Sequence, residues 1–177
     1  MYETSNDLTS TTRQSSIEML NQHLADAIDL HLQAKQAHWN IKGPNFVGLH
    51  ELFDRVAAQA SEYSDLIAER AVALGGVALG TLQVVSAQSQ LREYPLDVGA
   101  WPAHVRAMQY ALATFGRRVR KAIDDATVLN DADTADLFTE ISRGVDKSLW
   151  MVEAHIQDVP ADAKQLEERS ASRGESR

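Results

Sequence analysis

The sequence contains no cysteine and few aromatic residues, which make up 6% of its 177 residues. Without cysteine the chain has no disulfide bond, no thiolate metal ligand and no thiol nucleophile. A low aromatic content is unusual for a β-rich protein and ordinary for a helical one. Uninterrupted apolar runs of about 18 residues, which a membrane-spanning helix needs, are also absent. These absences favour a helical protein without a membrane segment.

Positive charge is scarce as well, because 17 lysine and arginine residues stand against 25 aspartate and glutamate residues. The net charge of -8 disfavours non-specific binding to nucleic acid and is compatible with attracting cations. The first residues carry no basic segment followed by an apolar run, so we predict no secretory signal. We therefore expect the protein in the cytoplasm.

Apolar residues recur at helical spacing in four long stretches of the chain. The first two, at about 16–41 and 45–75, are separated by a Gly-Pro pair that ends a helix. The third begins near Trp101, with proline in its first turn, and the fourth begins near Asp133. The segment between the second and third stretches is irregular, and we expect one short helix in it, at about 84–91.

Two helix pairs with tight turns, joined by one long connection, predict an all-α four-helix bundle with a single crossover, which is the ferritin-like topology. We expect this bundle to occupy residues 15–160. The two ends, 1–14 and 161–177, are polar and lack periodicity. We predict that both ends are mobile tails.

The second helical stretch carries two pairs of potential metal ligands. His50 and Asp54 are four residues apart, as are Asp65 and Glu69, so each pair projects from one face of a helix. All of these side chains fall within an arc of roughly 100° around the helix. Carboxylates gathered on one face repel one another unless they are solvated, paired with cations or bound to metal.

The two pairs are too far apart to hold one ion. At ~1.5 Å per residue, Asp54 and Asp65 are separated by about 16 Å along the helix, whereas metal–oxygen bonds are close to ~2 Å. A second copy of the helix, packed antiparallel across a two-fold axis, would place each pair opposite the other pair of its partner. Two equivalent sites per dimer would then form, as an isologous interface requires.

His38 lies near the end of the first helix, so an antiparallel hairpin brings it toward His50 and Asp54. Imidazoles and carboxylates in this combination suit iron(II), manganese or zinc. Di-iron centres within one ferritin-like subunit usually have glutamate three residues before histidine. None of the six histidines has glutamate at that position, so we expect a site between subunits. Four histidines fall outside this pattern and are expected to be structural or surface residues: His23, His31, His104 and His155.

The order of the ligand-type residues resembles the Dps family, the DNA-binding proteins from starved cells, also called mini-ferritins. The resemblance covers roughly residues 16–158, and five ligand-type residues at the family's spacing make it specific. A lone His-x3-Asp motif would be weak evidence for the family. The matching motif is His38-Trp39 followed by His50-x3-Asp54-x10-Asp65-x3-Glu69.

The resemblance implies a hollow shell of twelve identical subunits with 23 symmetry, with the short crossover helix at the two-fold interface. It implies di-iron ferroxidase sites at that interface, at which iron(II) is oxidised, preferentially with hydrogen peroxide, and stored as an iron(III) mineral. This chemistry protects against oxidative damage, and zinc or manganese would compete with iron. One subunit would supply His38, His50 and Asp54, and its partner Asp65 and Glu69.

Acidic residues at the start of the fourth helix are candidates for lining a three-fold pore. Rings of carboxylates concentrate negative potential and attract cations. The helix dipole also favours acidic residues at this end, and capping is compatible with pore lining. The three pore candidates are Asp131, Asp133 and Asp136.

The resemblance places Trp39 beside the metal site, where it either packs or intercepts radicals.

DNA binding is where the sequence departs from the family name. Members that bind DNA often carry a lysine-rich tail, whereas residues 1–14 hold Arg13 alone against Glu3 and Asp7. Residues 161–177 hold four basic and four acidic residues. A non-catalytic, nucleoid-associated DNA-compacting protein is therefore the weaker alternative, although weak tail contacts from many subunits add up. A surface antigen is a third alternative, disfavoured by the missing signal.

Overall fold

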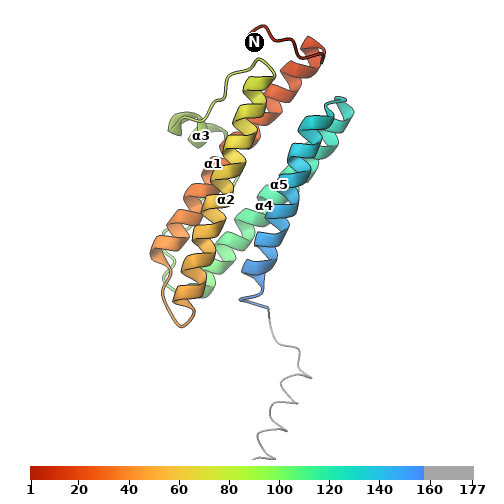
Figure 1. Ribbon diagram of the computed structural model, residues 1–177. Helices are drawn as coiled ribbons and strands as arrows, with labels where there is room; N and C mark the ends of the chain where they lie inside the picture. Colours follow the sequence, from red (N-terminus) through yellow and green to blue (C-terminus); the bar gives the residue numbers. More distant parts are fainter. Residues whose placement is uncertain (158–177) are drawn as a thin grey trace, which may run out of the picture.

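The structure, a computed structural model, describes residues 1–157, which contain helices and no strand. Four long helices form a bundle and one short helix lies beside it (Figure 1). The predicted all-α bundle with one long crossover is confirmed, while the predicted tail at 161–177 lies outside the described residues. The helices are α1 (Ser10–Asn40), α2 (Phe46–Ala73), α3 (Leu82–Gln88), α4 (Trp101–Val128) and α5 (Ala132–Glu153).

Each long helix packs against two others, because α1 contacts α2 and α4, and α5 contacts α4 and α2. Short turns join α1 to α2 and α4 to α5, whereas residues 74–100 run from one end of the bundle to the other (Figure 1). Helix α3 belongs to this crossover and packs on the outside of α1. Within residues 1–157, none of the helices combines the length and apolarity needed to cross a bilayer.

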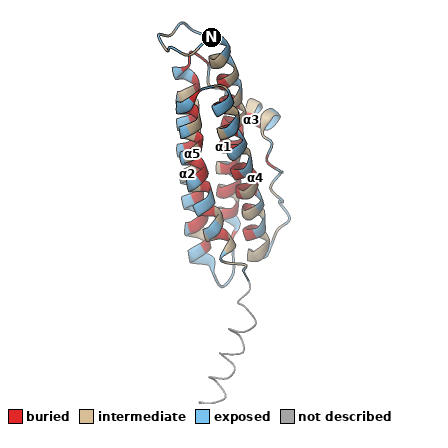
Figure 2. Ribbon diagram, turned by 90° about the vertical axis from the view of Figure 1, so that its right-hand side faces the viewer, coloured by how far each residue is buried: buried red, intermediate tan, exposed pale blue. Residues whose placement is uncertain are grey.

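The core lies where the apolar stripes of the four long helices meet (Figure 2). Burial of one such large apolar side chain contributes about 1.5–3 kcal/mol before the loss of chain entropy is subtracted. The predicted stripe of α2 faces this core along its whole length. Its buried members are Leu49, Leu52, Val56, Ala60, Tyr63 and Ile67.

Helix α1 begins at Ser10 rather than at the predicted Ser16. The side chain of Thr9 caps it, since its hydroxyl oxygen accepts the backbone N–H of Thr12 at 3.1 Å. Residues 10–14, predicted as part of a tail, are therefore helical. Periodicity missed them because these polar residues carry no buried stripe.

A buried carboxylate fixes the crossover to the bundle. Asp26 of α1 is 0% exposed and accepts hydrogen bonds at 2.7 Å from the Arg118 Nε of α4 and from the backbone N–H of Gln90. A carboxylate removed from water in this way needs such partners, because an unpaired buried charge costs several kcal/mol. Asp26 thereby links α1, α4 and the segment that follows α3.

The contact between α2 and α5 generates the first testable prediction. A Cβ added to Gly144 of α5 would overlap the hydroxyl of Tyr63 on α2. Alanine is otherwise favoured over glycine in a helix by about 1 kcal/mol, so close approach explains this glycine. We expect Gly144→Ala to lower the free energy of unfolding by about 1–3 kcal/mol, measured by denaturant titration.

The control for this prediction is Tyr63→Phe, because the Tyr63 hydroxyl has no hydrogen-bond partner within residues 1–157. Removing an unpartnered buried hydroxyl costs little. In the Tyr63→Phe background the penalty of Gly144→Ala should become smaller. An equal penalty in both backgrounds would contradict the proposed clash.

Candidate metal centre

Two histidines form reciprocal hydrogen bonds across the hairpin between α1 and α2. The His38 Nδ1–H donates to the His50 carbonyl at 2.8 Å, and the His50 Nδ1–H donates to the His38 carbonyl at 2.9 Å. Their rings stack with centroids 3.7 Å apart. A carbonyl oxygen only accepts, so Nδ1 carries the proton of each neutral ring and Nε2 keeps its lone pair. Both imidazoles are thus oriented to bind a metal through Nε2.

The turn before α2 sets this alignment. Gly43 adopts a φ of 117°, a left-handed conformation that suits glycine. A Cβ there would lie 3.0 Å from the Cδ1 atom of Trp101, at the start of α4. The turn is therefore both tight and packed against a third helix, which fixes the register of α1 on α2 and places His38 beside His50.

Asp54 lies one turn beyond His50, and its Oδ1 atom is 4.0 Å from the Nδ1 atom of His38. The same oxygen accepts a hydrogen bond from Lys35 Nζ at 2.8 Å. This bond lowers the pKa of Asp54 against a smaller effect of desolvation, and the charges of Lys35 and the two imidazoles lower it further. Asp54 is therefore ionised at neutral pH and faces solvent.

Lys35 is a site residue that sequence reasoning missed. It lies three residues before His38, on the same face of α1, and that spacing was the available signal. Its Nζ atom also lies 5.7 Å from the centre of the Trp39 ring, within reach of a cation–π interaction. Lys35 therefore neutralises the charge of Asp54.

The second ligand pair stands apart from the first. Asp65 and Glu69 are both exposed on α2, about three and four turns beyond Asp54 at about 3.6 residues per turn. Within residues 1–157, no group of three or more side chains of ligand type is close enough to hold a metal. The structure thus brings His38, His50 and Asp54 near one another and leaves Asp65 and Glu69 separate. One chain alone contains two incomplete ligand groups.

Comparison with known proteins places this bundle in a family. Residues 17–161 match the ferritin-like domain of the Ferritin family. The chain is 47% identical over 157 residues to the DNA protection during starvation protein of Agrobacterium fabrum, which covers 89% of this chain and 97% of that relative. The chain belongs to the Dps family of ferritin-like proteins. Iron oxidation and storage is the general role of this family.

Solved Dps structures share the fold. The Dps of Mycobacterium smegmatis aligns with a TM-score of 0.85 and 28% identity over 90% of each chain. The Dps of Microbacterium arborescens, solved in a high iron form, aligns with a TM-score of 0.79 and 31% identity. That alignment covers 85% of this chain and 99% of the other. The predicted family and the ferritin-like fold are confirmed.

One of the three pore candidates of this Dps chain has another role. Asp131 is 1% exposed and caps α5 by accepting the backbone N–H of Thr134 at 3.1 Å. It also accepts hydrogen bonds from Ser16 Oγ at 2.7 Å and from the Arg70 guanidinium at 2.6 Å. The prediction that Asp131 lines a pore is therefore corrected, because its carboxylate is buried and joins α1, α2 and α5.

The two other pore candidates and the tryptophan remain accessible. Asp133 and Asp136 are exposed on the first turns of α5, and Asp133 lies 3.5 Å from Arg70. Trp39, next to His38 in the chain, is 65% exposed. Pore lining and radical interception stay predictions for these residues.

Two of the remaining histidines are structural, as predicted. His23 is buried, and its two ring nitrogens face the carbonyls of Met19 and Arg118 at 2.9 and 3.2 Å. His104 is also buried, and its Nδ1 atom is hydrogen bonded to the Tyr94 hydroxyl at 2.6 Å. Neither ring is directed toward the α1–α2 ligand group, so neither belongs to the candidate site.

The buried carboxylate of Asp131 generates a pH-dependent prediction. Desolvation alone would raise its pKa, but the hydrogen bonds from Thr134, Ser16 and Arg70 together lower it below 3.8. A lowered folded-state pKa contributes stability above the unfolded-state pKa of about 3.9, and that stability disappears as the pH falls through the folded-state pKa. We expect Asp131→Asn to lower the free energy of unfolding at pH 7 by about 1–3 kcal/mol.

The measurement is denaturant unfolding at several pH values, in which the deficit of Asp131→Asn should shrink below a pH of about 4. Asp125→Asn is the matched control, because its carboxylate forms a partly exposed ion pair with Lys121. Such a surface pair contributes about 0–1 kcal/mol. Equal destabilisation by both variants would contradict the central role of Asp131.

Proposed function

We propose that this Dps protein oxidises iron(II) at sites formed between two chains and stores the iron(III) inside a shell. The observation that carries the proposal is the arrangement of ligands on α2. His50 and Asp54, joined by His38, form one incomplete group, and Asp65 and Glu69 form another about 16 Å farther along the helix. An antiparallel α2 from a second chain completes both groups at once.

Iron(II) is the substrate, and the ligands divide between two positions. Asp65 and Glu69 hold the tighter position together with His38 of the partner subunit. His50 and Asp54 help to hold a second, weaker position. The weaker affinity follows from Lys35, whose Nζ atom already neutralises Asp54 at 2.8 Å and has to be displaced by the arriving cation. Zinc and manganese compete for the same oxygen and nitrogen ligands.

Hydrogen peroxide is the proposed oxidant. Each of two iron(II) ions gives up one electron, the O–O bond of the peroxide breaks, and two protons complete two water molecules. The protein supplies geometry, because its ligands hold the ions close together and keep a one-electron side reaction from releasing radicals. Trp39, exposed beside the site, is the proposed trap for an escaping radical.

An apolar groove supports pairing of two chains near α3. Its volume is about 410 Å³, and it runs between α1 and the crossover. Leu82 at the start of α3 is 68% exposed and Leu32 of α1 is 44% exposed, which is costly for large apolar side chains in a monomer. A second chain would cover them, as expected for a short crossover helix at a two-fold interface. The proposed number of twelve chains with 23 symmetry is based on the resemblance to the Dps family.

The route of iron into the shell follows the exposed acidic residues of α5. Asp133 and Asp136 would line a three-fold pore, because like-charged rings concentrate the potential that attracts cations. Arg70, 3.5 Å from Asp133, partly offsets this charge. The shell would then deliver iron(II) to the oxidation sites and retain the mineral.

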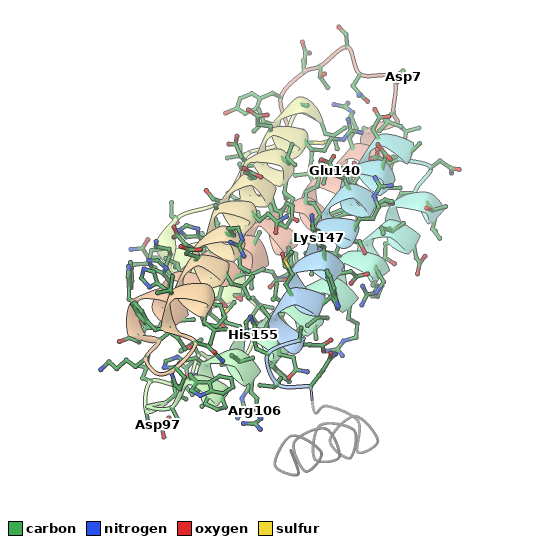
Figure 3. All side chains as sticks on the ribbon, turned by 60° about the horizontal axis from the view of Figure 1, so that its bottom comes forward. Asp7, Asp97, Arg106, Glu140, Lys147 and His155 are labelled. Atoms are coloured by element: carbon green, nitrogen blue, oxygen red, sulfur yellow. The ribbon has the colours of Figure 1, made fainter. Side chains whose placement is uncertain are left out.

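The segment before α1 does not favour DNA compaction, because residues 1–9 hold Glu3 and Asp7 and no lysine or arginine. The backbone N–H of Tyr2 donates to the Gly75 carbonyl at 2.6 Å, so the first residues lie against the end of α2. Asp7 lies at the opposite end of the bundle from Arg106, so the acidic N-terminal segment and this basic side chain do not share one surface (Figure 3). Within the described residues, no observation favours a DNA-compacting function.

The direct test removes the second ligand pair. We expect Asp65→Ala with Glu69→Ala to leave the assembled particle intact and to reduce the rate of iron(II) oxidation by peroxide at least 100-fold. The physical reason is the loss of both carboxylates at the tighter position, while neither side chain is part of the core. Stopped-flow absorbance measures the rate, and light scattering measures the particle mass.

The matched control is Asp97→Ala with Asp124→Ala, which removes the same charge from two exposed positions away from α2. Its oxidation rate should stay within about twofold of the unmodified protein, since exposed charges away from the site act only through screened long-range attraction. Unchanged kinetics in the Asp65 and Glu69 variant would refute the site assignment.

A complementation experiment tests whether two chains share each site. One inactive variant carries Asp65→Ala and Glu69→Ala, and the other carries His38→Ala and Asp54→Ala. After co-assembly, about half of the dimers are mixed and each mixed dimer has one intact site, so roughly a quarter of the oxidation sites return. Recovered activity requires shared sites, whereas a mixture as inactive as its components would contradict them.

A further inference from the structure

His31 is the partly exposed histidine of α1 that the oxidation site does not use. Its Nδ1–H donates to the Ala57 carbonyl of α2 at 2.8 Å. This is the same arrangement that His38 makes with the carbonyl of His50. Because Nδ1 carries the proton, the lone pair of the neutral His31 ring lies on Nε2, which remains available to a metal.

His31 lies at a level of the bundle between the two ligand groups of α2. Its partner Ala57 lies between the two ligand groups of α2, and the midpoint between Asp54 and Asp65 falls between Gln59 and Ala60. Ala57 is within about 4 Å of that midpoint along the helix axis. Its carbonyl points along the helix toward the midpoint, so the bonded imidazole lies still closer to it.

In the dimer proposed above, this midpoint marks the level of the two-fold axis. If Asp54 of one chain faces Asp65 of the other, the two-fold axis has to pass between the two α2 helices at the level of this midpoint. His31 therefore lies at the height of this axis. It also shares a face of α1 with His38, seven residues later, and the proposed dimer turns that face toward the partner chain. A residue close to such an axis is paired with itself, so one imidazole per chain becomes two imidazoles per dimer.

A groove with no lysine or arginine of residues 1–157 in its lining lies beside His31. This groove between α1 and α2, about 710 Å³ in volume, begins next to His31, because its lining includes Ile28, one turn away on α1, and Ala58, which follows Ala57. The carboxylates of Glu62 and Asp65 also line it. Lys35, one turn from His31 on α1, is paired with Asp54. Small side chains allow close approach, and the carboxylates favour a cation.

We propose that the two His31 side chains of a dimer bind one zinc ion on the two-fold axis, between the two oxidation sites. The inference rests on the chain pairing of the proposed function. Two Nε2 atoms at about 2.0–2.1 Å would supply half of a tetrahedral coordination shell, and water or the carboxylate of Glu62, which the test background retains, would complete it. Imidazole is a ligand that suits zinc. Because zinc is not redox-active, an ion bound at this site would hold the two chains together without taking part in iron oxidation.

The experiment is a zinc titration of assembled particles by calorimetry, in the background of Asp65→Ala and Glu69→Ala. This background weakens zinc binding at the oxidation sites, whereas it leaves His31 unchanged. His31→Ala is then added to it. The matched control adds His155→Ala, which removes a partly exposed imidazole beyond the end of α5 (Figure 3). Particle mass and thermal midpoint are measured for every variant, with and without zinc.

We expect the His31→Ala particles to bind about one zinc ion fewer per two chains than the His155→Ala particles. Zinc should also raise the thermal midpoint of the control and not that of the His31 variant. Equal zinc binding by the two assembled variants overturns the His31 site. That result leaves the proposed function intact if Asp65→Ala with Glu69→Ala still abolishes oxidation. Both proposals would be refuted if every variant and the unmodified protein were monomeric, or if the co-assembled variants of the complementation experiment stayed inactive.

Discussion

The spacing of ligands along α2 is the constraint on which the proposed chemistry depends. A helix advances by about 1.5 Å per residue and does not bend enough to bring Asp54 and Asp65 onto one ion. His38 and His50 are held on the Asp54 side by the hydrogen bonds of the hairpin, so rearrangement of side chains does not close the distance. Pairing of two chains is therefore part of the proposed site, and the proposed activity depends on assembly.

The carboxylates of this chain divide into two groups that differ in what neutralises them. Asp26 and Asp131 are buried, and hydrogen bonds and arginine side chains within the same chain compensate both of them. These carboxylates stabilise the bundle. Asp65 and Glu69 are exposed on one face of α2, and Asp54 is also largely exposed and is paired with Lys35. Carboxylates left in this state are suited to an external cation, so the same chemical group is structural in one place and a candidate ligand in another.

The hairpin between α1 and α2 serves the fold and the site at the same time. Each of its imidazoles donates Nδ1–H to a carbonyl of the facing helix, which secures the helix pair and also fixes the tautomer. A histidine in this position binds metal without losing its structural hydrogen bond, because the two functions use different nitrogens. The arrangement recurs at His31, His38 and His50, so the metal-binding potential of this face extends beyond the family motif.

The sequence by itself determined the four long helices and the buried stripe of α2, and it predicted that the candidate site needs a second chain. Each of these follows from helical geometry, which is local and repeats along the chain. Only the tertiary structure decided that Asp131 is a buried cap rather than a pore residue, that Lys35 neutralises Asp54, and that the His31 ring leaves Nε2 free. These facts depend on contacts between residues far apart in the chain, such as Ser16 with Asp131. Periodicity carries no information about such contacts, because it records which face of a helix is apolar and not which helix that face meets.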